Sequence, residues 1–172
     1  HTRLYDNYEP LDEETEGKWS DYIVETLSHA GFHRYEVSNF ALGNHESEHN
    51  KVYWHYDNYY GVGIGATGKI DDELISHSRS LTDYLQGKNT IYIEKETIED
   101  TMFNHLMMSL RLEEGLDLDE FKRRYHCSVE DVYKEALTKN LGNHSLIIEN
   151  NHLKTNDTLD LLNSILLDFL PE

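Results

Sequence analysis

The pattern of apolar and polar positions in the first forty residues predicts a helix followed by a strand. Between residues 11 and 30, apolar side chains recur at helical spacing, at Trp19, Ile23, Leu27 and Ala30. Acidic residues fill the first turn, where they complement the helix dipole, and Gly31 is placed to end the helix. Residues 34–40 then read as a short strand, so this region is typical of an α/β fold.

The next region predicts extended chain around a glycine-rich run. Glycine occupies every second position from Gly61 to Gly65 and returns at Gly68. In a strand-like run such glycines supply no packing, so we expect a ligand or another backbone to come very close. The elements predicted after this run are a hairpin, a short helix and an extended segment, over residues 69–78, 81–85 and 91–94.

From residue 96 onward the pattern is mainly helical. The predicted elements are three helices, a β-hairpin and a last helix, over residues 98–110, 117–125, 128–141, 145–155 and from 157 to Leu170. This order is typical of a winged-helix-like domain, so we expect two domains, residues 1–90 and 91–172. The helix over 128–141, with Val132, Ala136 and Leu137 expected inward, lacks a basic face. This favours packing or protein docking over DNA binding.

Composition excludes several classes of function. The 172 residues carry a formal net charge of −18, so contact with nucleic acid or an anionic membrane would be repulsive. The single cysteine, Cys127, excludes a disulfide framework and a metal cluster held by cysteines alone. We find neither an apolar run long enough to span a membrane nor a leader, and therefore expect a cytoplasmic protein without a membrane span.

Residues 49–68 combine aromatic rings and two histidines with the glycine run. Flat apolar faces and imidazole nitrogens suit a large planar or metal-centred ligand. The alternative is a Tyr- and Trp-rich hairpin in which the glycines form bulges.

Two short motifs overlap this region without their usual context. His45-Glu46-Ser47-Glu48-His49 matches the HExxH pattern of zinc proteases, but polar residues surround it in place of an apolar helix face. Gly63, Gly65 and Gly68 match GxGxxG, but a turn follows where a dinucleotide site requires a helix. We interpret the first motif as an acidic loop and give the second little weight.

Four sequence blocks, in order, resemble one known family. They are YEVSNFA at 35–41, HNKVYW at 49–54, YYGVGIGATG at 59–68, and LRLEEGLDL at 110–118 with Phe121. Together they resemble the radical S-adenosylmethionine family of oxygen-independent coproporphyrinogen III oxidase-like proteins. The HNxxYW block is similar to the haem-chaperone (HemW-like) branch of that family.

The resemblance implies a fold and a set of ligand contacts. Residues 1–90 would form the end of a partial (β/α) barrel that holds a [4Fe–4S] cluster and S-adenosylmethionine, followed by the C-terminal domain. The implied S-adenosylmethionine contacts are Gly61, Gly63, Ile64, Gly65 and Ala66. The implied haem contacts are His49, as candidate iron ligand, with Tyr53 and Trp54 lining the porphyrin plane.

One departure from the family pattern limits what this chain can do alone. The family binds its cluster through a CxxxCxxC motif, which is absent here. We therefore expect a C-terminal fragment, catalytically inactive by itself, of a longer haem-binding and haem-transfer protein. Its expected partners are haem or porphyrin, the N-terminal half of the barrel and a haem-acceptor protein.

Two alternative functions stay open at this point. One is oxygen-independent coproporphyrinogen III oxidation by the full-length protein, whose tetracarboxylate ligand would need cations. The bases offered for it, Arg34, Lys51, Lys69 and Arg79, do not form a convincing cluster in the sequence. The other is a non-catalytic module in which the winged-helix-like region docks a partner protein.

Overall fold

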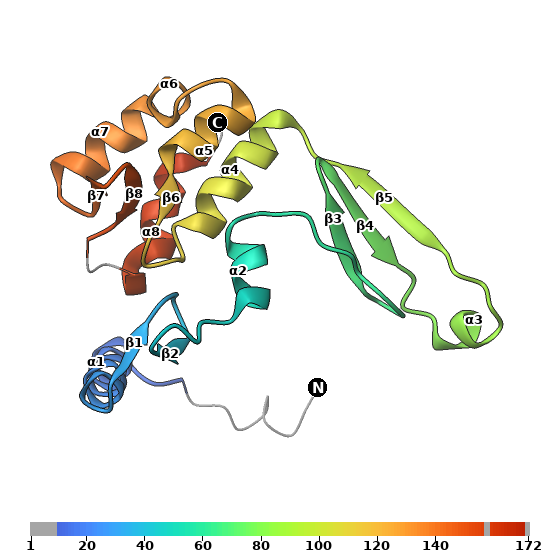
Figure 1. Cartoon of the computed structure of the whole chain (residues 1–172), viewed down its shortest axis with the longest axis horizontal. Helices are drawn as coiled ribbons and strands as arrows, with labels where there is room; N and C mark the ends of the chain where they lie inside the picture. The colour runs from blue at the N-terminus through green and yellow to red at the C-terminus, as the bar shows by residue number, and fades with distance from the viewer. Residues whose placement is uncertain (1–9, 157–158, 171–172) are drawn as a thin grey trace. The chain divides into compact units, whose positions relative to one another are not determined.

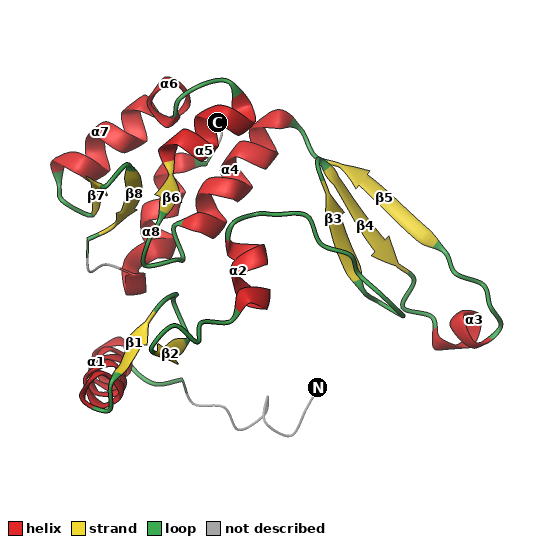
Figure 2. Ribbon diagram, in the orientation of Figure 1, coloured by secondary structure: helices red, strands yellow, loops and turns green. Residues whose placement is uncertain are grey.

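The fold is described by a computed structural model over residues 10–156 and 159–170. The chain separates into two compact units, which are described one at a time. The first contains the described residues through Arg34 together with Ser38–Glu46, and the second contains Tyr35–Val37 and the chain from Ser47 onward. Figure 1 labels the elements in chain order, and Figure 2 separates helices from strands.

The first unit is a helix joined to a two-stranded antiparallel sheet. Helix α1 (Glu13–His29) confirms the predicted helix, and the side chain of Asp12 caps it by accepting the Thr15 N–H at 2.9 Å. Gly31, with φ of +86°, ends it as predicted. Strands β1 (Phe32–Arg34) and β2 (Phe40–Leu42) then pair antiparallel.

The single strand predicted over residues 34–40 is wrong. Its central residues, Tyr35–Val37, belong to the second unit, because they form backbone hydrogen bonds with a segment far along the chain. The Val37 N–H donates to the Arg111 carbonyl, and Glu36 forms a β-bridge with Leu112. Local pattern cannot reveal this, because the partner lies about seventy residues away in sequence.

The second unit begins with a short helix and a three-stranded sheet. Helix α2 (Glu48–Trp54) is capped by Ser47. The sheet has the order β3 (Thr67–Ile70), β4 (Glu73–His77), β5 (Ile91–Lys95), with both pairings antiparallel. The predicted hairpin, the short helix α3 (Leu81–Leu85) and the extended segment are therefore confirmed. Strand β5 pairs with β4, which precedes the predicted domain boundary at residue 90. The division into domains at that residue stays a prediction.

Residues 61–66 form a loop, and the strand-like conformation predicted for them is wrong. Two of the predicted close approaches nevertheless exist, and both are to backbone. A Cβ on Gly61 would lie 2.5 Å from the Thr67 carbonyl carbon, and one on Gly68 would lie 2.7 Å from the Gly61 nitrogen. The loop therefore folds directly onto the start of β3.

The rest of the second unit packs around one hydrophobic core. Its elements are α4 (Ile98–Ser109), β6 (Leu116–Asp117), α5 (Leu118–Tyr125), α6 (Val129–Val132), α7 (Lys134–Gly142), β7 (Leu146–Glu149), β8 (His152–Thr155), η2 (Leu159–Leu161), α8 (Leu162–Leu166) and η3 (Leu167–Phe169). Leu106, Phe121, Leu153 and Phe169 are almost completely buried in this core. The β7–β8 hairpin is confirmed, with Asn150 and Asn151 at positive φ in its turn.

Two helix predictions in this region need correction. The helix predicted over 128–141 is broken at Tyr133 into α6 and α7, and Val132, expected inward, is 37% exposed. The last helix is short and flanked by 3-10 turns, with Leu170 exposed, and its predicted start at residue 157 lies outside the described residues. The winged-helix assignment stays a prediction.

Every strand pairing within the described ranges is antiparallel, and the assignment of residues 1–90 to the end of a partial (β/α) barrel stays a prediction. Among the described helices, none is both long and apolar enough to cross a bilayer.

A glycine substitution tests the packing of the second unit. Gly115 has φ of +79°, and a Cβ there would lie 2.3 Å from the Leu153 carbonyl oxygen on β8. We expect Gly115→Ala to lower the free energy of unfolding by at least about 2 kcal/mol, measured by urea denaturation. Gly142→Ala, where nothing lies within 4 Å of the added Cβ, should be neutral or up to about 1 kcal/mol more stable. Equal stability of the two variants would contradict the packing.

Candidate functional site

Three rings meet at the surface of α2. His49 and Tyr53 lie one helical turn apart, and the Tyr53 hydroxyl is 3.2 Å from His49 Nε2. Their ring planes are almost perpendicular, with centroids 5.0 Å apart. Tyr59, from the segment after the helix, packs against Tyr53 with a centroid distance of 4.6 Å. We call His49, Tyr53 and Tyr59 the ring ladder.

An exposed apolar loop continues directly from the ring ladder. Tyr60 is 84% exposed and Val62 is 89% exposed, and Ile64 is also exposed. Such a concentration of exposed apolar side chains on one short loop is typical of a contact surface. The loop is turned by Gly63 and Gly65, with φ of +98° and +69°, which glycine adopts readily.

The predicted cofactor glycines have different structural roles. Gly61 allows the backbone contact with β3 described above. Nothing lies within 4 Å of the Cβ position of Gly63, whereas a Cβ on Gly65 would lie 3.4 Å from the Arg79 side chain. The Gly65 N–H donates to the Ser78 carbonyl, and the Ala66 N–H to the Gly63 carbonyl. Only Gly63 therefore leaves open space on its Cβ side.

Trp54 does not join the ring ladder in the contacts observed. Its indole lies 5.9 Å from the Arg111 guanidinium, and its carbonyl accepts a hydrogen bond from the Ser109 hydroxyl of α4. Its Nε1 is buried without a hydrogen-bond partner among the described residues. Trp54 as a haem-lining residue stays a prediction.

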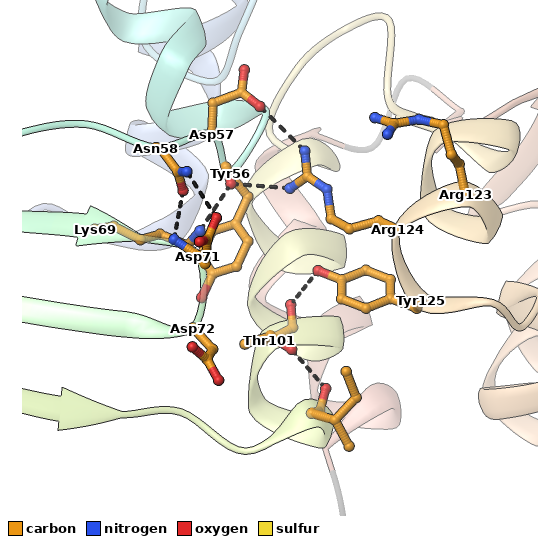
Figure 3. A pocket seen from close by; sticks show the side chains of 11 residues that line it. Tyr56, Asp57, Asn58, Lys69, Asp71, Asp72, Thr101, Arg123, Arg124 and Tyr125 are labelled. Carbon is orange, nitrogen blue, oxygen red and sulfur yellow. Dashed lines mark hydrogen bonds and ion pairs between the residues drawn. The ribbon is translucent and has the colours of Figure 1, made fainter.

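Two cations hold the backbone just after α2. Tyr56 has an unusual positive φ of +56°, and its carbonyl accepts hydrogen bonds from Arg124 Nη1 at 3.0 Å and Lys69 Nζ at 3.2 Å. Figure 3 shows both side chains directed at Tyr56. Arg124 also pairs with Asp57 at 3.2 Å and with Glu120 at 3.1 Å. We call Arg124, Lys69 and the Tyr56 carbonyl the carbonyl clamp.

The carbonyl clamp is continuous with the ring ladder. The backbone groups of Lys69 and Tyr59 exchange two hydrogen bonds of 2.9 Å, so Lys69 fixes both ends of the segment from Tyr56 to Tyr59. The Lys69 ammonium also lies 4.0 Å from the centre of the Tyr56 ring. Lys69 is 4% exposed, and burial, followed by the nearby charge of Arg124, lowers its pKa. Lys69 is therefore a structural cation, not the carboxylate-binding one considered from the sequence.

The Tyr56 side chain anchors the same segment to α4. Its hydroxyl donates to Glu96 at 2.6 Å, and Asn104 donates to the other oxygen of that carboxylate at 2.6 Å. Burial raises the pKa of Tyr56, and Glu96 adds to the effect. Tyr56 also lines a cavity of about 510 Å³, together with Lys69, Asp71, Arg123, Arg124 and Tyr125 among others (Figure 3).

A buried histidine lies behind the carbonyl clamp. His105 is 2% exposed and stacks between Tyr56 and Phe121, with centroid distances of 6.2 and 5.9 Å. Its Nδ1 has no hydrogen-bond partner among the described residues. Burial, with a smaller effect from Arg124, lowers the pKa of His105 to about 3, so the ring is neutral near pH 7.

The described residues do not form a preorganised metal site. Within residues 10–156 and 159–170, no group of three or more His, Cys, Asp or Glu side chains has a geometry that could hold a metal ion. His45 precedes α2, so the HExxH match does not lie on one helix, and Glu46 pairs with His33 at 2.9 Å. Cys127 lies 3.8 Å from the Met102 sulfur. One cysteine does not fit a [4Fe–4S] cluster.

The carbonyl clamp was not predicted from the sequence. Arg124 lies on α5, about seventy residues after Tyr56, and nothing in the local pattern of α5 distinguishes it from Arg123. The structure does distinguish them, because the Arg124 side chain is 25% exposed and the Arg123 side chain 74%.

This difference supports a matched pair of substitutions. Arg124→Gln should lower the free energy of unfolding by about 1.5–3 kcal/mol, because a charged donor to a partly buried carbonyl is lost. Arg123→Gln, which loses only exposed bonds to Glu120, should cause no measurable change. Urea denaturation of both variants is the measurement. Equal destabilisation would show that the bond from Arg124 to the Tyr56 carbonyl contributes no extra stability.

His105 predicts a pH dependence of stability. Its folded pKa of about 3 lies below the ordinary value of 6.5, so the unfolded chain binds a proton first as the pH falls. The contribution of His105 is fully present above pH 6.5 and is lost progressively as the pH falls from 6.5 towards 3. His105→Phe, which keeps a stacked ring, should remove about 2 kcal/mol of the stability difference between pH 7 and pH 5. An unchanged difference would refute the assignment.

The comparisons with known proteins agree with one another. Residues 97–158 match the family model for the HemN C-terminal domain. The chain is 30% identical over 158 residues to heme chaperone HemW of Lactococcus lactis, covering 87% of this chain and 41% of that protein. It is 35% identical over 99 residues to heme chaperone HemW of Synechocystis, covering 54% of this chain and 24% of that protein. The chain thus spans less than half the length of these relatives.

The fold points the same way. The structure resembles that of coproporphyrinogen III oxidase (HemN) from Escherichia coli, a radical SAM enzyme, with a TM-score of 0.69 at 14% identity. The match covers 92% of this chain and 42% of that one, and at this identity it shows the fold alone. Sequence and fold together assign the chain to the HemN/HemW family, as a HemW-like C-terminal portion.

Proposed function

We propose that this chain carries a haem-binding surface, formed by the ring ladder and the exposed loop 60–64, and that it serves haem transfer. The observation that carries the proposal is the combination of an exposed imidazole and a half-buried phenol with exposed apolar side chains directly beyond them. Haem is large, flat and apolar, with an iron that accepts nitrogen or oxygen donors. The names of the relatives, heme chaperone HemW, support the same ligand.

The donor set at the surface fits haem as a cargo. His49 is exposed and Tyr53 is half-buried, so a ligand as large as a porphyrin can reach the hydrogen-bonded pair. Val62 and Ile64 would cover one porphyrin edge and exclude water from it. Arg79 is exposed beside Gly65 and is placed to pair with a propionate. The role of these residues is to bind and orient the cargo, and no bond of the porphyrin needs to be broken.

The second candidate function, porphyrinogen oxidation by a longer protein, has weaker support here. Lys69 is bound within the carbonyl clamp, which removes it from the four bases considered for the carboxylates. Because a single cysteine does not fit the [4Fe–4S] cluster, no radical step is assigned to these residues. The relative with that activity, HemN, supports the fold only.

Three further expectations belong to the longer protein. We propose that the loop 61–66 contacts S-adenosylmethionine there, supported by the open space beside Gly63. The N-terminal barrel half and a haem-acceptor protein are the proposed partners. The cytoplasmic location and a docking role for the C-terminal domain stay predictions.

A haem titration of the purified chain tests the proposal. We expect a saturable Soret change, weakened at least tenfold (about 1.4 kcal/mol) in the double variant His49→Ala/Tyr53→Phe. Val62→Ser/Ile64→Ser should weaken binding too, because apolar contact is lost. His45→Ala, an exposed histidine just before α2, is the matched control and should bind as the wild type does. Absence of saturable binding by the wild-type chain would refute the proposal.

A further inference from the structure

The hydrogen bond inside the ring ladder bears on which atom binds iron. From the residues and the family resemblance, His49 is the candidate ligand. In the structure, however, its Nε2 is 3.2 Å from the Tyr53 hydroxyl and is therefore not a free donor atom. We infer that the Tyr53 oxygen is the iron-binding atom and that His49 acts on it as a hydrogen-bond partner. This inference rests on the proposed haem-binding function.

The direction of this hydrogen bond decides whether an imidazole nitrogen is free. If the phenol donates, the bond occupies the Nε2 lone pair and the neutral ring carries its proton on Nδ1, so neither nitrogen can bind iron; if the imidazole donates, Nε2 has no lone pair and only Nδ1 could bind. We take the phenol as the donor. In neither case can Nε2 bind iron while the bond persists. The phenolic oxygen keeps at least one lone pair in both cases, and tyrosine is an established axial ligand to haem iron.

The packing around Tyr53 holds its oxygen in place. Tyr59 packs edge-on against the Tyr53 ring, and the backbone of Tyr59 is tied to Lys69 of the carbonyl clamp. His49 is anchored separately, in the first turn of α2. A side chain fixed by both ring packing and a hydrogen bond loses little further conformational entropy on binding a ligand.

The binding step balances in atoms and charge. The O–H bond of Tyr53 breaks, its proton passes to His49 Nε2, and the phenolate oxygen forms a bond to ferric iron as a water molecule leaves the iron. The iron stays ferric, and the positive charge moves from the ferric porphyrin to the imidazolium. Phenolate is a hard anionic ligand, so it favours the ferric over the ferrous ion. Reduction of the iron should therefore release the haem.

Spectra of single variants test this assignment. The ferric complex of the wild-type chain should show a phenolate-to-iron charge-transfer band and phenolate modes in resonance Raman spectra. Tyr53→Phe should lose both signatures and bind haem at least tenfold more weakly. His49→Ala should keep the phenolate signatures with weaker binding, because the proton acceptor is lost. Reduction with dithionite should weaken binding by the wild type at least tenfold.

A tyrosine outside the proposed haem surface supplies the control. Tyr92→Phe changes an exposed tyrosine of β5 and should leave the spectrum and affinity unchanged. Circular dichroism on each variant checks that α2 is retained. If Tyr53→Phe keeps the wild-type spectrum while His49→Ala loses it, His49 is the ligand and the inference is overturned. If the wild-type chain binds no haem, the proposed function itself fails, which is a separate outcome.

Discussion

The second unit depends on the carbonyl of Tyr56 and the two cations that bind it. A non-glycine residue at positive φ costs on the order of 1–3 kcal/mol, and burying Lys69 adds a desolvation penalty that is visible in its lowered pKa. Each hydrogen bond from a charged donor contributes about 1.5–3 kcal/mol. One such bond would only offset the backbone strain, so both Arg124 and Lys69 are needed for this turn to be stable.

This interaction assigns a role to the HemN C-terminal domain beyond forming its own core. Residues 97–158 match that domain, and they contain Arg124, which reaches out to the segment following α2. Lys69 continues the connection through its backbone pairing with Tyr59, which packs on Tyr53. A contact on α5 therefore determines where the rings of α2 lie, and the proposed haem surface and the helical core form one structural unit.

The ring ladder shows why an exposed donor is not always an available one. His49 is the obvious metal ligand by residue type, yet its nitrogen is shared with a phenol one turn away. Because of this hydrogen bond, His49 and Tyr53 are proposed to bind haem as a pair, with the oxygen of Tyr53 on the iron. The same reasoning separates the glycines, because Gly61 and Gly68 accommodate backbone whereas Gly63 leaves space for a ligand.

The sequence by itself determined most of the local elements. Three helices, α1, α4 and α6, begin within two residues of their predicted starts, with Asp12, Thr97 and Ser128 as the observed caps. Asn150-Asn151 makes the final hairpin turn, and all these preferences act within a few residues. Tertiary structure alone decided the outcome at Tyr35–Val37, at the helix break at Tyr133, and at the carbonyl clamp. Each of the long-range pairings, Glu36 with Leu112 and Tyr56 with Arg124, joins backbone to a partner about seventy residues away. Such partners satisfy buried polar groups, and a periodic pattern of apolar positions carries no information about which distant donor will reach a given carbonyl.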